Sequence, residues 1–282
     1  MGVCYENGVP TSKDPTVLQR ITSPMPVDGH TNTKSFDYLS LPNVRMFQEF
    51  VPSEAVWEEM WPVRNALYTY DSMLQAVAKF PAFCGEAPAG KNKLQTCGRE
   101  IATLFAHMTQ ETGLVDPSNP NPIWKQGLYH IGEMNCVPGG PGAGSWNCDY
   151  KSTNWSATFY PPKSSVQYYG RGPIQLSWNY NYGAFSNIFT ESKYDSKMYL
   201  LENPEEAASS GYTAFSAALW FYMTPQSPKP SMHDVATGLW VPNATDINSG
   251  LKQDDGKNCF GITTNIINGG LECGQGRETY GS

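Results

Sequence analysis

Apolar residues between positions 101 and 112 recur at the spacing of one face of a helix. They occupy the i, i+3, i+4 and i+7 positions, at Ile101, Leu104, Phe105 and Met108. Such a stripe is typical of an amphipathic helix whose apolar side packs on a core. The sequence therefore predicts a helix over residues 101–112.

Proline and capping residues mark two further helices. One begins at Asp71, places apolar residues on one face and ends at Pro81, because a proline ring cannot continue a helix. The other begins with Asn203 as a capping residue, followed by Pro204 at the first helical position and acidic residues in the first turn. It is expected to run to Met223. These patterns indicate a mainly α chain.

Glu111 lies at the border of the apolar stripe of the helix over residues 101–112. A carboxyl group held against apolar neighbours favours its neutral form, so its pKa rises toward the range of a general acid. Glu133 follows 22 residues later and supplies a second carboxylate that could stay ionised. Two such groups suit glycoside hydrolysis, although a helical glutamate is more often a solvated surface charge. The two glutamates alone are therefore weak evidence for a catalytic site, and the other residues of the sequence have to support it.

The segment from Tyr168 to Gly183 combines aromatic rings with neutral hydrogen-bonding side chains and little net charge. Sugars present apolar C–H faces and many hydroxyl groups, so their binding sites need this mixture. The composition also fits a tightly turned, buried segment in which glycines and Pro173 set the backbone and tyrosines fill the core. Short strands are expected between Tyr168 and Leu176. Composition leaves both interpretations open.

The same segment carries a resemblance to a known family. Residues 169–177 (YGRGPIQLS), followed by residues 179–183 (NYNYG), resemble the signature of family 19 glycoside hydrolases, the chitinases of plants and some bacteria. Further stretches resemble the family in the same order, at residues 68–71 with 80–83, 218–225, 229–234 and 260–274. The resemblance covers residues 54 to 274.

The resemblance implies a mainly α, two-lobed, lysozyme-like fold with a central groove and a few short strands. It also implies inverting endo-hydrolysis of chitin, the β-1,4-linked polymer of N-acetylglucosamine. Glu111 matches the family's general acid, and Glu133 matches the base that activates water on the opposite face of the sugar. Ser177, by resemblance, helps to hold that water.

The resemblance assigns substrate binding to four further side chains, which are suited to hydrogen-bond hydroxyl or N-acetyl groups. These are Gln175, Tyr180, Asn181 and Asn268. Trp146 belongs to a long loop, rich in glycine and proline, over residues 137–162. It is expected either to stack on a sugar ring or to pin that loop to the domain.

Two departures from the family pattern keep other functions open. Relatives usually carry a histidine directly before the acid, where this chain has Gln110, and they continue into a final helix that is expected to be missing beyond Ser282. The alternatives are a peptidoglycan-cleaving lysin of the same family and a chitin-binding protein without turnover. The presence of both glutamates weighs against the second alternative.

Length and composition predict one catalytic domain. A chain of 282 residues is long enough for a substantial core, and no repeat divides it. Residues 44–282 are assigned to the catalytic domain, and the proline-rich residues 1–43 to an extension that is packed on the surface or partly disordered. The protein is expected to be a monomer.

Charge and residue spacing exclude several classes of function. A formal net charge of −7 argues against a nucleic-acid partner, which requires neutralisation of phosphates. No apolar run is long enough to span a membrane. The four histidines are scattered, and His107 with Glu111 lacks the zinc-protease pattern, so no metal or other cofactor is expected. His107 is interpreted as a core residue or as one that supports the site.

The seven cysteines fit a secreted protein if six of them form disulfides, whereas reduced thiols would fit a cytosolic one. Nearness in sequence favours three pairs among the roughly 15 possible pairings. These are Cys84 with Cys97, Cys136 with Cys148, and Cys259 with Cys273, which leaves Cys4 free.

Overall fold

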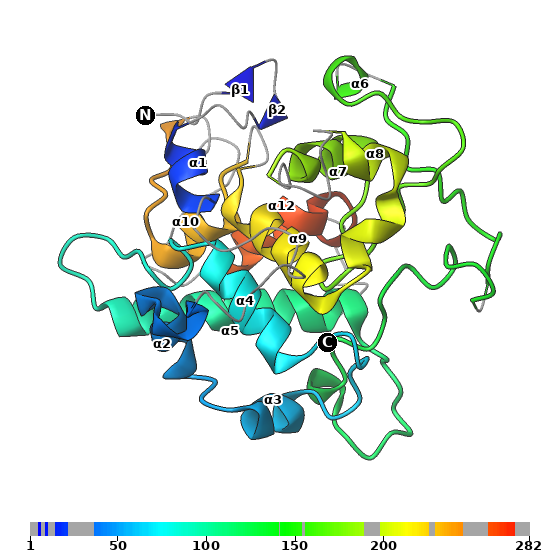
Figure 1. Ribbon diagram of the computed structural model, residues 1–282. Coiled ribbons are helices and arrows are strands. Elements are labelled where there is room, and N and C mark those ends of the chain that lie inside the picture. The colour runs from blue at the N-terminus through cyan, green and yellow to red at the C-terminus, as the bar shows by residue number, and fades with distance from the viewer. Residues whose placement is uncertain are drawn as a thin grey trace.

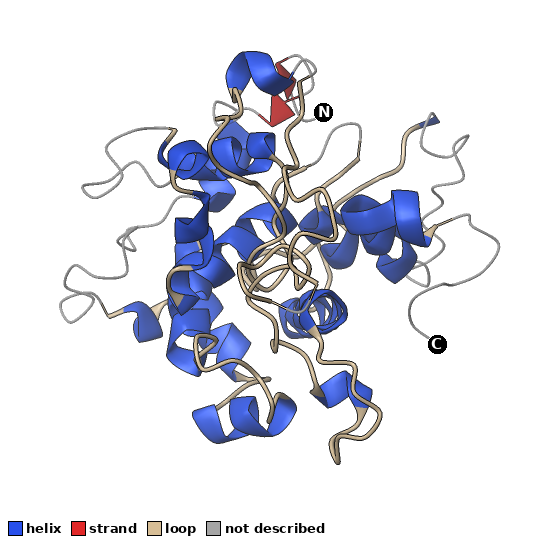
Figure 2. Ribbon diagram, turned by 90° about the vertical axis from the view of Figure 1, so that its right-hand side faces the viewer, coloured by secondary structure: helices blue, strands red, loops and turns tan. Residues whose placement is uncertain are grey.

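The computed structural model describes residues 5–6, 9–10, 15–21, 37–140, 142–153, 156–188, 198–225, 229–244 and 259–273. This part of the chain is mainly helical, and a single two-stranded hairpin lies near the N-terminus (Figures 1 and 2). The elements are β1 (Tyr5–Glu6), β2 (Val9–Pro10), α1 (Pro15–Ile21), η2 (Tyr38–Ser40), α2 (Pro42–Gln48), α3 (Glu54–Met60), α4 (Tyr70–Lys79), α5 (Lys93–Thr112), η3 (Ile123–Lys125), α6 (Ser156–Phe159), α7 (Asn179–Ser186), α8 (Tyr199–Glu202), η4 (Pro204–Ala208), α9 (Gly211–Met223), α10 (Met232–Thr237) and α12 (Cys259–Glu272).

Two of the predicted helices are confirmed. Helix α4 begins after Thr69, whose side chain accepts a hydrogen bond from the Ser72 amide, and it ends just before Pro81. Helix α5 contains the predicted residues 101–112 and starts earlier, because Asn92 caps it by accepting a hydrogen bond from the Gln95 amide. The additional turns of α5 carry no apolar run, and their boundary is set by this cap.

The predicted start of the third helix at Asn203 is wrong. Pro204 opens only the short 3₁₀ helix η4, and α9 begins at Gly211. Ser210 caps α9 by accepting a hydrogen bond from the Thr213 amide at 3.1 Å. A Cβ at Gly211 would lie 2.2 Å from the Leu67 carbonyl oxygen, so this close approach requires glycine and fixes where α9 starts.

The strands expected between Tyr168 and Leu176 do not form. Arg171 makes isolated bridges with Gly132 and with Leu176 instead. Gly172 and Gln175 adopt left-handed backbone angles, with φ of +76° and +50°, and turn the chain back on itself. This tight turn leaves no length for a strand.

Helix α9 lies in the middle of the fold, and all of its residues are buried (Figure 1). A helix that is apolar on all sides must be surrounded by other elements. Trp57 of α3 contacts Phe215 of α9 and Phe105 of α5, with ring centroids 5.7 and 6.0 Å apart. Phe47 of α2 adds a further edge contact to Phe105 at 6.1 Å. These rings join the N-terminal helices to α5 and α9.

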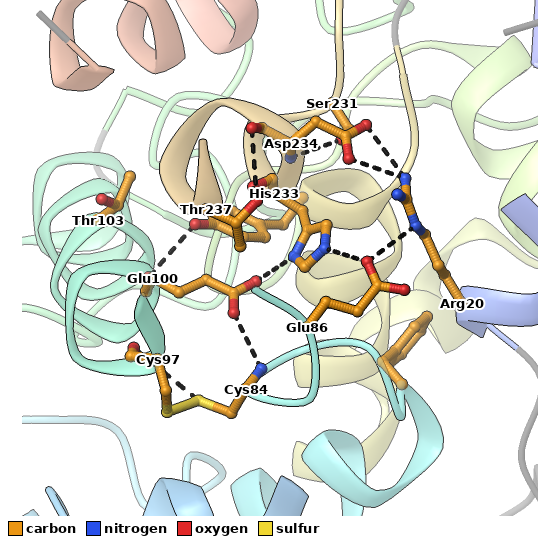
Figure 3. A network of polar contacts seen from close by, with 12 residues as sticks. Arg20, Cys84, Glu86, Cys97, Glu100, Thr103, Ser231, His233, Asp234 and Thr237 are labelled. Carbon is orange, nitrogen blue, oxygen red and sulfur yellow. Dashed lines mark hydrogen bonds and ion pairs between the residues drawn. A yellow bond between two sulfur atoms is a disulfide. The ribbon is translucent and has the colours of Figure 1, made fainter. Parts of the chain in front are cut away.

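A charged network joins four segments of the fold (Figure 3). Buried His233 of α10 contacts Glu100 of α5 through Nδ1 and Glu86 through Nε2, the latter at 3.0 Å. Arg20 of α1 forms ion pairs with Glu86 at 3.3 Å and with Asp234 at 2.9 Å. Part of the segment expected to be an extension is thus bound to the domain.

His233 has three carboxylates close by, and they change its protonation. Burial lowers its pKa, but the negative charge of Glu100 and hydrogen bonds to Glu100 and Glu86 outweigh that effect and raise it to about 9. Glu100 also accepts a hydrogen bond from the Cys84 amide at 2.9 Å. The imidazole is therefore a cation at neutral pH, and it binds carboxylates from two different segments.

Two of the three expected disulfides are formed, between Cys84 and Cys97 and between Cys136 and Cys148. The expected pairing of Cys259 with Cys273 is wrong. Cys259 opens α12 and Cys273 follows its last residue, so they are about 20 Å apart at the usual helical rise. Cys273 is a free thiol. Cys4 lies outside the described residues.

Candidate active site

Seven of the eight residues that the sequence assigned to the site surround one cavity of about 760 Å³. They come from α5, from the segment after it, from the turn before α7, from α7 itself and from α12. The seven are Glu111, Glu133, Gln175, Ser177, Tyr180, Asn181 and Asn268. Trp146 is 63% exposed and is not among the residues that line the cavity, so its contact with a sugar stays a prediction.

Backbone hydrogen bonds bring the two glutamates into the same cavity. The carbonyl of Thr112, the last residue of α5, accepts hydrogen bonds from the Tyr129 and His130 amides at 3.1 and 3.0 Å. The Glu133 amide donates to the Gly170 carbonyl at 2.9 Å. These bonds hold the segment that follows α5 between the end of that helix and the turn at Gly170. In this way Glu111 and Glu133, which are 22 residues apart in the sequence, come to line the same cavity.

Glu111 is half-buried in the last turn of α5. Burial raises its pKa from 4.5 to about 8, and the nearby negative charge of Glu272 raises it as well. The carboxyl group therefore holds its proton at neutral pH. This is the protonation state that a general acid needs before it reacts.

Glu133 accepts a hydrogen bond at each of its oxygens. Tyr150 donates from its hydroxyl group to Oε1 at 2.8 Å, and the Gly170 amide donates to Oε2 at 3.3 Å. An ionised carboxylate has only acceptors, so two donors suit it. The two glutamates thus occupy different environments, one that favours a proton and one that supplies donors.

Three residues that line the cavity have a strained backbone. Tyr150, Gln175 and Trp178 have φ of +44°, +50° and +76°, and all three line the cavity. Such angles cost non-glycine residues roughly 1–3 kcal/mol each and are found preferentially at functional sites. The Ser177 hydroxyl donates to the Gln175 carbonyl at 2.9 Å, which fixes its oxygen beside the turn.

Helix α12 also contributes residues that line the cavity. Asn268 interrupts the helix with φ of −141°, and its side chain donates to Glu272 at 2.8 Å. Buried His107 of α5 bonds the Thr263 hydroxyl at 2.9 Å and stacks on Phe260, with centroids 4.8 Å apart. Burial lowers the pKa of His107 to about 4, so the ring is neutral and joins α5 to α12.

A family model described as chitinase class I, of glycoside hydrolase family 19, matches residues 52–281. The chain belongs to this family. Its mainly α, lysozyme-like fold agrees with solved structures of the family. Chitinase C from Streptomyces griseus is 27% identical with a TM-score of 0.50, over 81% of this chain and 70% of that one. A class IV chitinase from Zea mays is 26% identical with a TM-score of 0.50, over 81% and 85%.

Curated relatives of this family 19 chain carry different names. Inactive chitinase-like protein 1 of Hevea brasiliensis is 38% identical over 236 residues, which are 79% of this chain and 64% of that protein. Endochitinase A2 of Pisum sativum is 40% identical over 212 residues, 75% of this chain and 56% of that protein. Endochitinase of Carica papaya is 36% identical over 237 residues, 81% and 84%. The chain thus spans less than two thirds of the first two relatives.

Several residues that line the cavity of this family 19 chain were missed by the sequence analysis. Tyr150, Trp178, Phe221 and Lys229 are the polar or aromatic ones, and Glu272, which accepts a hydrogen bond from the lining residue Asn268, was missed as well. Glu272 follows Asn268 by four residues on one helix, a spacing that could have revealed the contact. Tyr150 follows Cys148 by two residues, so the correctly expected disulfide could have placed it near Glu133. Lys229 binds the Asn265 and Ile266 carbonyls, a contact that no local pattern indicates.

The described residues of this family 19 chain contain no cluster of three side chains that could hold a metal ion. His107 is engaged by Thr263, and His233 by two carboxylates. None of the helices in the described part of the chain has the length and hydropathy to cross a bilayer.

Proposed function

We propose that this protein cleaves internal glycosidic bonds of chitin, in one step and with inversion at the anomeric carbon. One observation carries the proposal, namely that Glu111 and Glu133 line the same cavity in opposite environments. Burial and Glu272 keep a proton on Glu111, with its pKa raised to about 8. Glu133 accepts hydrogen bonds at both oxygens.

In this mechanism Glu111 donates its proton to the glycosidic oxygen as the bond to the anomeric carbon breaks. Glu133 takes a proton from a water molecule that attacks that carbon from the opposite face. Ser177 holds the water. Gln175, Tyr180, Asn181 and Asn268 bind hydroxyl and N-acetyl groups and so fix the pose of the sugars.

A chitin-binding role without turnover has one specific argument, because a relative is named inactive. The departure at Gln110 does not strengthen it, since this side chain is exposed and does not line the cavity. The acid itself is present and neutral. Hydrolysis therefore remains the better supported function.

The test is hydrolysis of a chitin hexamer, with the anomer of the new reducing end followed by NMR within minutes of mixing. Initial α-anomer is expected, because inversion of a β-linkage gives it. Initial β-anomer would refute inversion. Glu111→Gln and Glu133→Gln should each lower kcat by roughly 10²- to 10⁴-fold. Binding of the hexamer without products would favour the chitin-binding role, and faster release of products from bacterial walls would favour a lysin.

We further propose that the protein acts outside the cell as a monomer. Two disulfides fit an oxidising compartment. Glu111 and Glu133, the two glutamates of the proposed mechanism, line one cavity of a single chain, which supports a monomer. Sedimentation at micromolar concentration and analysis of the culture medium of the source cells test the two statements.

A further inference from the structure

The Cys136–Cys148 disulfide closes a loop whose two ends lead directly to the site. Glu133 precedes Cys136 by three residues, and the Cys136 amide donates to the Glu133 carbonyl at 2.9 Å. Tyr150 follows Cys148 by two residues. The covalent link thus draws together two residues that are 17 positions apart in the sequence. Their side chains meet where the loop closes.

Tyr150 is held in place by contacts on several sides. Its backbone is strained, with φ of +44°, and its carbonyl accepts a hydrogen bond from the Asn179 amide at 3.2 Å. Its ring meets the Trp178 ring edge to face, with centroids 5.4 Å apart. It also packs against a small cluster formed by the two cysteines of the disulfide and Tyr169. A tyrosine side chain has few rotamers, so these contacts fix where its hydroxyl group points.

The hydroxyl group of Tyr150 points at Oε1 of Glu133, at 2.8 Å. A carboxylate oxygen has two lone-pair directions, and this bond occupies one of them. The Gly170 amide occupies one direction at Oε2. With both oxygens held, the carboxylate cannot rotate freely about its terminal bond. The lone pairs that remain free are those that can accept a proton in the cavity.

We propose that Tyr150 is a positioning residue for Glu133, and that the Cys136–Cys148 disulfide keeps it in position. The proposal rests on the proposed function, in which Glu133 is the base. Tyr150 itself does not exchange a proton with the substrate. It fixes the direction from which Glu133 takes the proton of the attacking water, and this step is sensitive to small displacements.

The contact can be tested without turnover. Burial, the hydrogen bond to Glu133 and the charge of Glu133 together raise the pKa of Tyr150 to about 12. In protein with ¹³C-labelled tyrosine, the Tyr150 signal is assigned by its loss in Tyr150→Phe. Glu133→Gln should lower the pH at which this signal titrates, while Glu111→Gln should leave it in place. An unchanged titration in Glu133→Gln would overturn the proposal whether or not the protein hydrolyses chitin.

The role in catalysis is tested by a double-mutant cycle on the hexamer. Tyr150→Phe should lower kcat by roughly 10- to 100-fold with little change in KM, because a charge-assisted bond to the base is lost. In a Glu133→Gln background the same change should have almost no effect. The matched control is Tyr160→Phe, which removes a buried hydroxyl that bonds Asn187 away from the cavity and should keep kcat. Equal losses in both backgrounds would refute positioning through Glu133.

The two disulfides provide a second comparison, because they close loops of similar length. Replacing Cys136 and Cys148 by serine should lower kcat of the folded protein as Tyr150→Phe does, and adding Tyr150→Phe should lower it no further. The control replaces Cys84 and Cys97, whose disulfide closes a loop that leads to neither Glu133 nor Tyr150. It should preserve kcat at temperatures where the protein is folded. An intact kcat without Cys136 and Cys148 would remove the disulfide from the proposal.

Discussion

Replacing Glu111 by glutamine keeps the size and shape of the side chain and removes its ability to ionise. In the folded protein, burial and then the charge of Glu272 raise the pKa of this carboxyl group from 4.5 to about 8. In the unfolded chain the group titrates near its ordinary value. The wild-type protein must therefore keep a proton on Glu111 in order to fold at neutral pH, and the variant need not.

The magnitude follows from the linkage between protonation and folding. Below pH 4 both states carry the proton, so Glu111 contributes no difference. As the pH rises from 4.5 to about 8, only the unfolded state releases its proton, and the folded state loses stability. At pH 7 the solution is about 2.5 pH units above the ordinary pKa of 4.5 that applies to the unfolded chain. Each of these units corresponds to ~1.4 kcal/mol. The wild-type protein is thus less stable by about 3 kcal/mol than it would be with a neutral side chain.

The assay is equilibrium unfolding in urea at pH 4 and pH 7 for wild type and Glu111→Gln. The variant should be more stable by about 3 kcal/mol at pH 7 and by almost nothing at pH 4. Glu49→Gln, at an exposed glutamate, controls for a general effect of charge and should give the same small change at both values. Equal stability of wild type and Glu111→Gln at pH 7 would mean that Glu111 is ionised in the fold. The assignment of Glu111 as the acid would then fail.

Three further predictions concern Glu272, His233 and Trp178. Glu272→Gln keeps an acceptor for Asn268 but removes a charge that raises the pKa of Glu111, so the alkaline limb of kcat against pH should move to lower pH. The raised pKa of His233, about 9, stabilises the fold below pH 6.5, and this contribution is lost as the pH rises through 9. In a Glu111→Gln background, His233→Asn should abolish that loss in urea unfolding curves. Trp178→Ala removes a half-exposed ring from the cavity and should weaken binding of the hexamer to Glu111→Gln by roughly 2- to 10-fold in calorimetry.

The sequence could predict what depends on short-range pattern. The stripe over residues 101–112 and the proline after α4 gave the right helices, because periodicity and chain geometry are local. The start of α9 was missed because it depends on the close approach of Gly211 to the carbonyl oxygen of Leu67, a residue that is far away in the sequence. The expected strands failed for a similar reason, since the left-handed angle at Gln175 is adopted by a residue type that rarely takes it.

Most of the residues that the sequence assigned to the site line one cavity, but the residues that hold them in place were not predicted. The resemblance named the groups that face the cavity, and the structure brings seven of them together. It could not name Tyr150, which reaches Glu133 through a disulfide and a strained backbone. Nearness in sequence was a sound guide for two disulfides, but it failed for Cys259 and Cys273 because a helix separates them.

Arg20 places a limit on how short an active form of this chain can be made. The family match begins at residue 52, and a protein expressed from that boundary would retain every residue that lines the cavity. It would lose the guanidinium group that lies between Glu86 and Asp234, which would then repel each other with only His233 to offset them. Helix α10 carries His233 and Asp234 and contacts both α5 and α12, the helices of Glu111 and Asn268. A protein that begins at residue 52 is therefore expected to be less stable than one that includes α1, although this helix lies outside the family match.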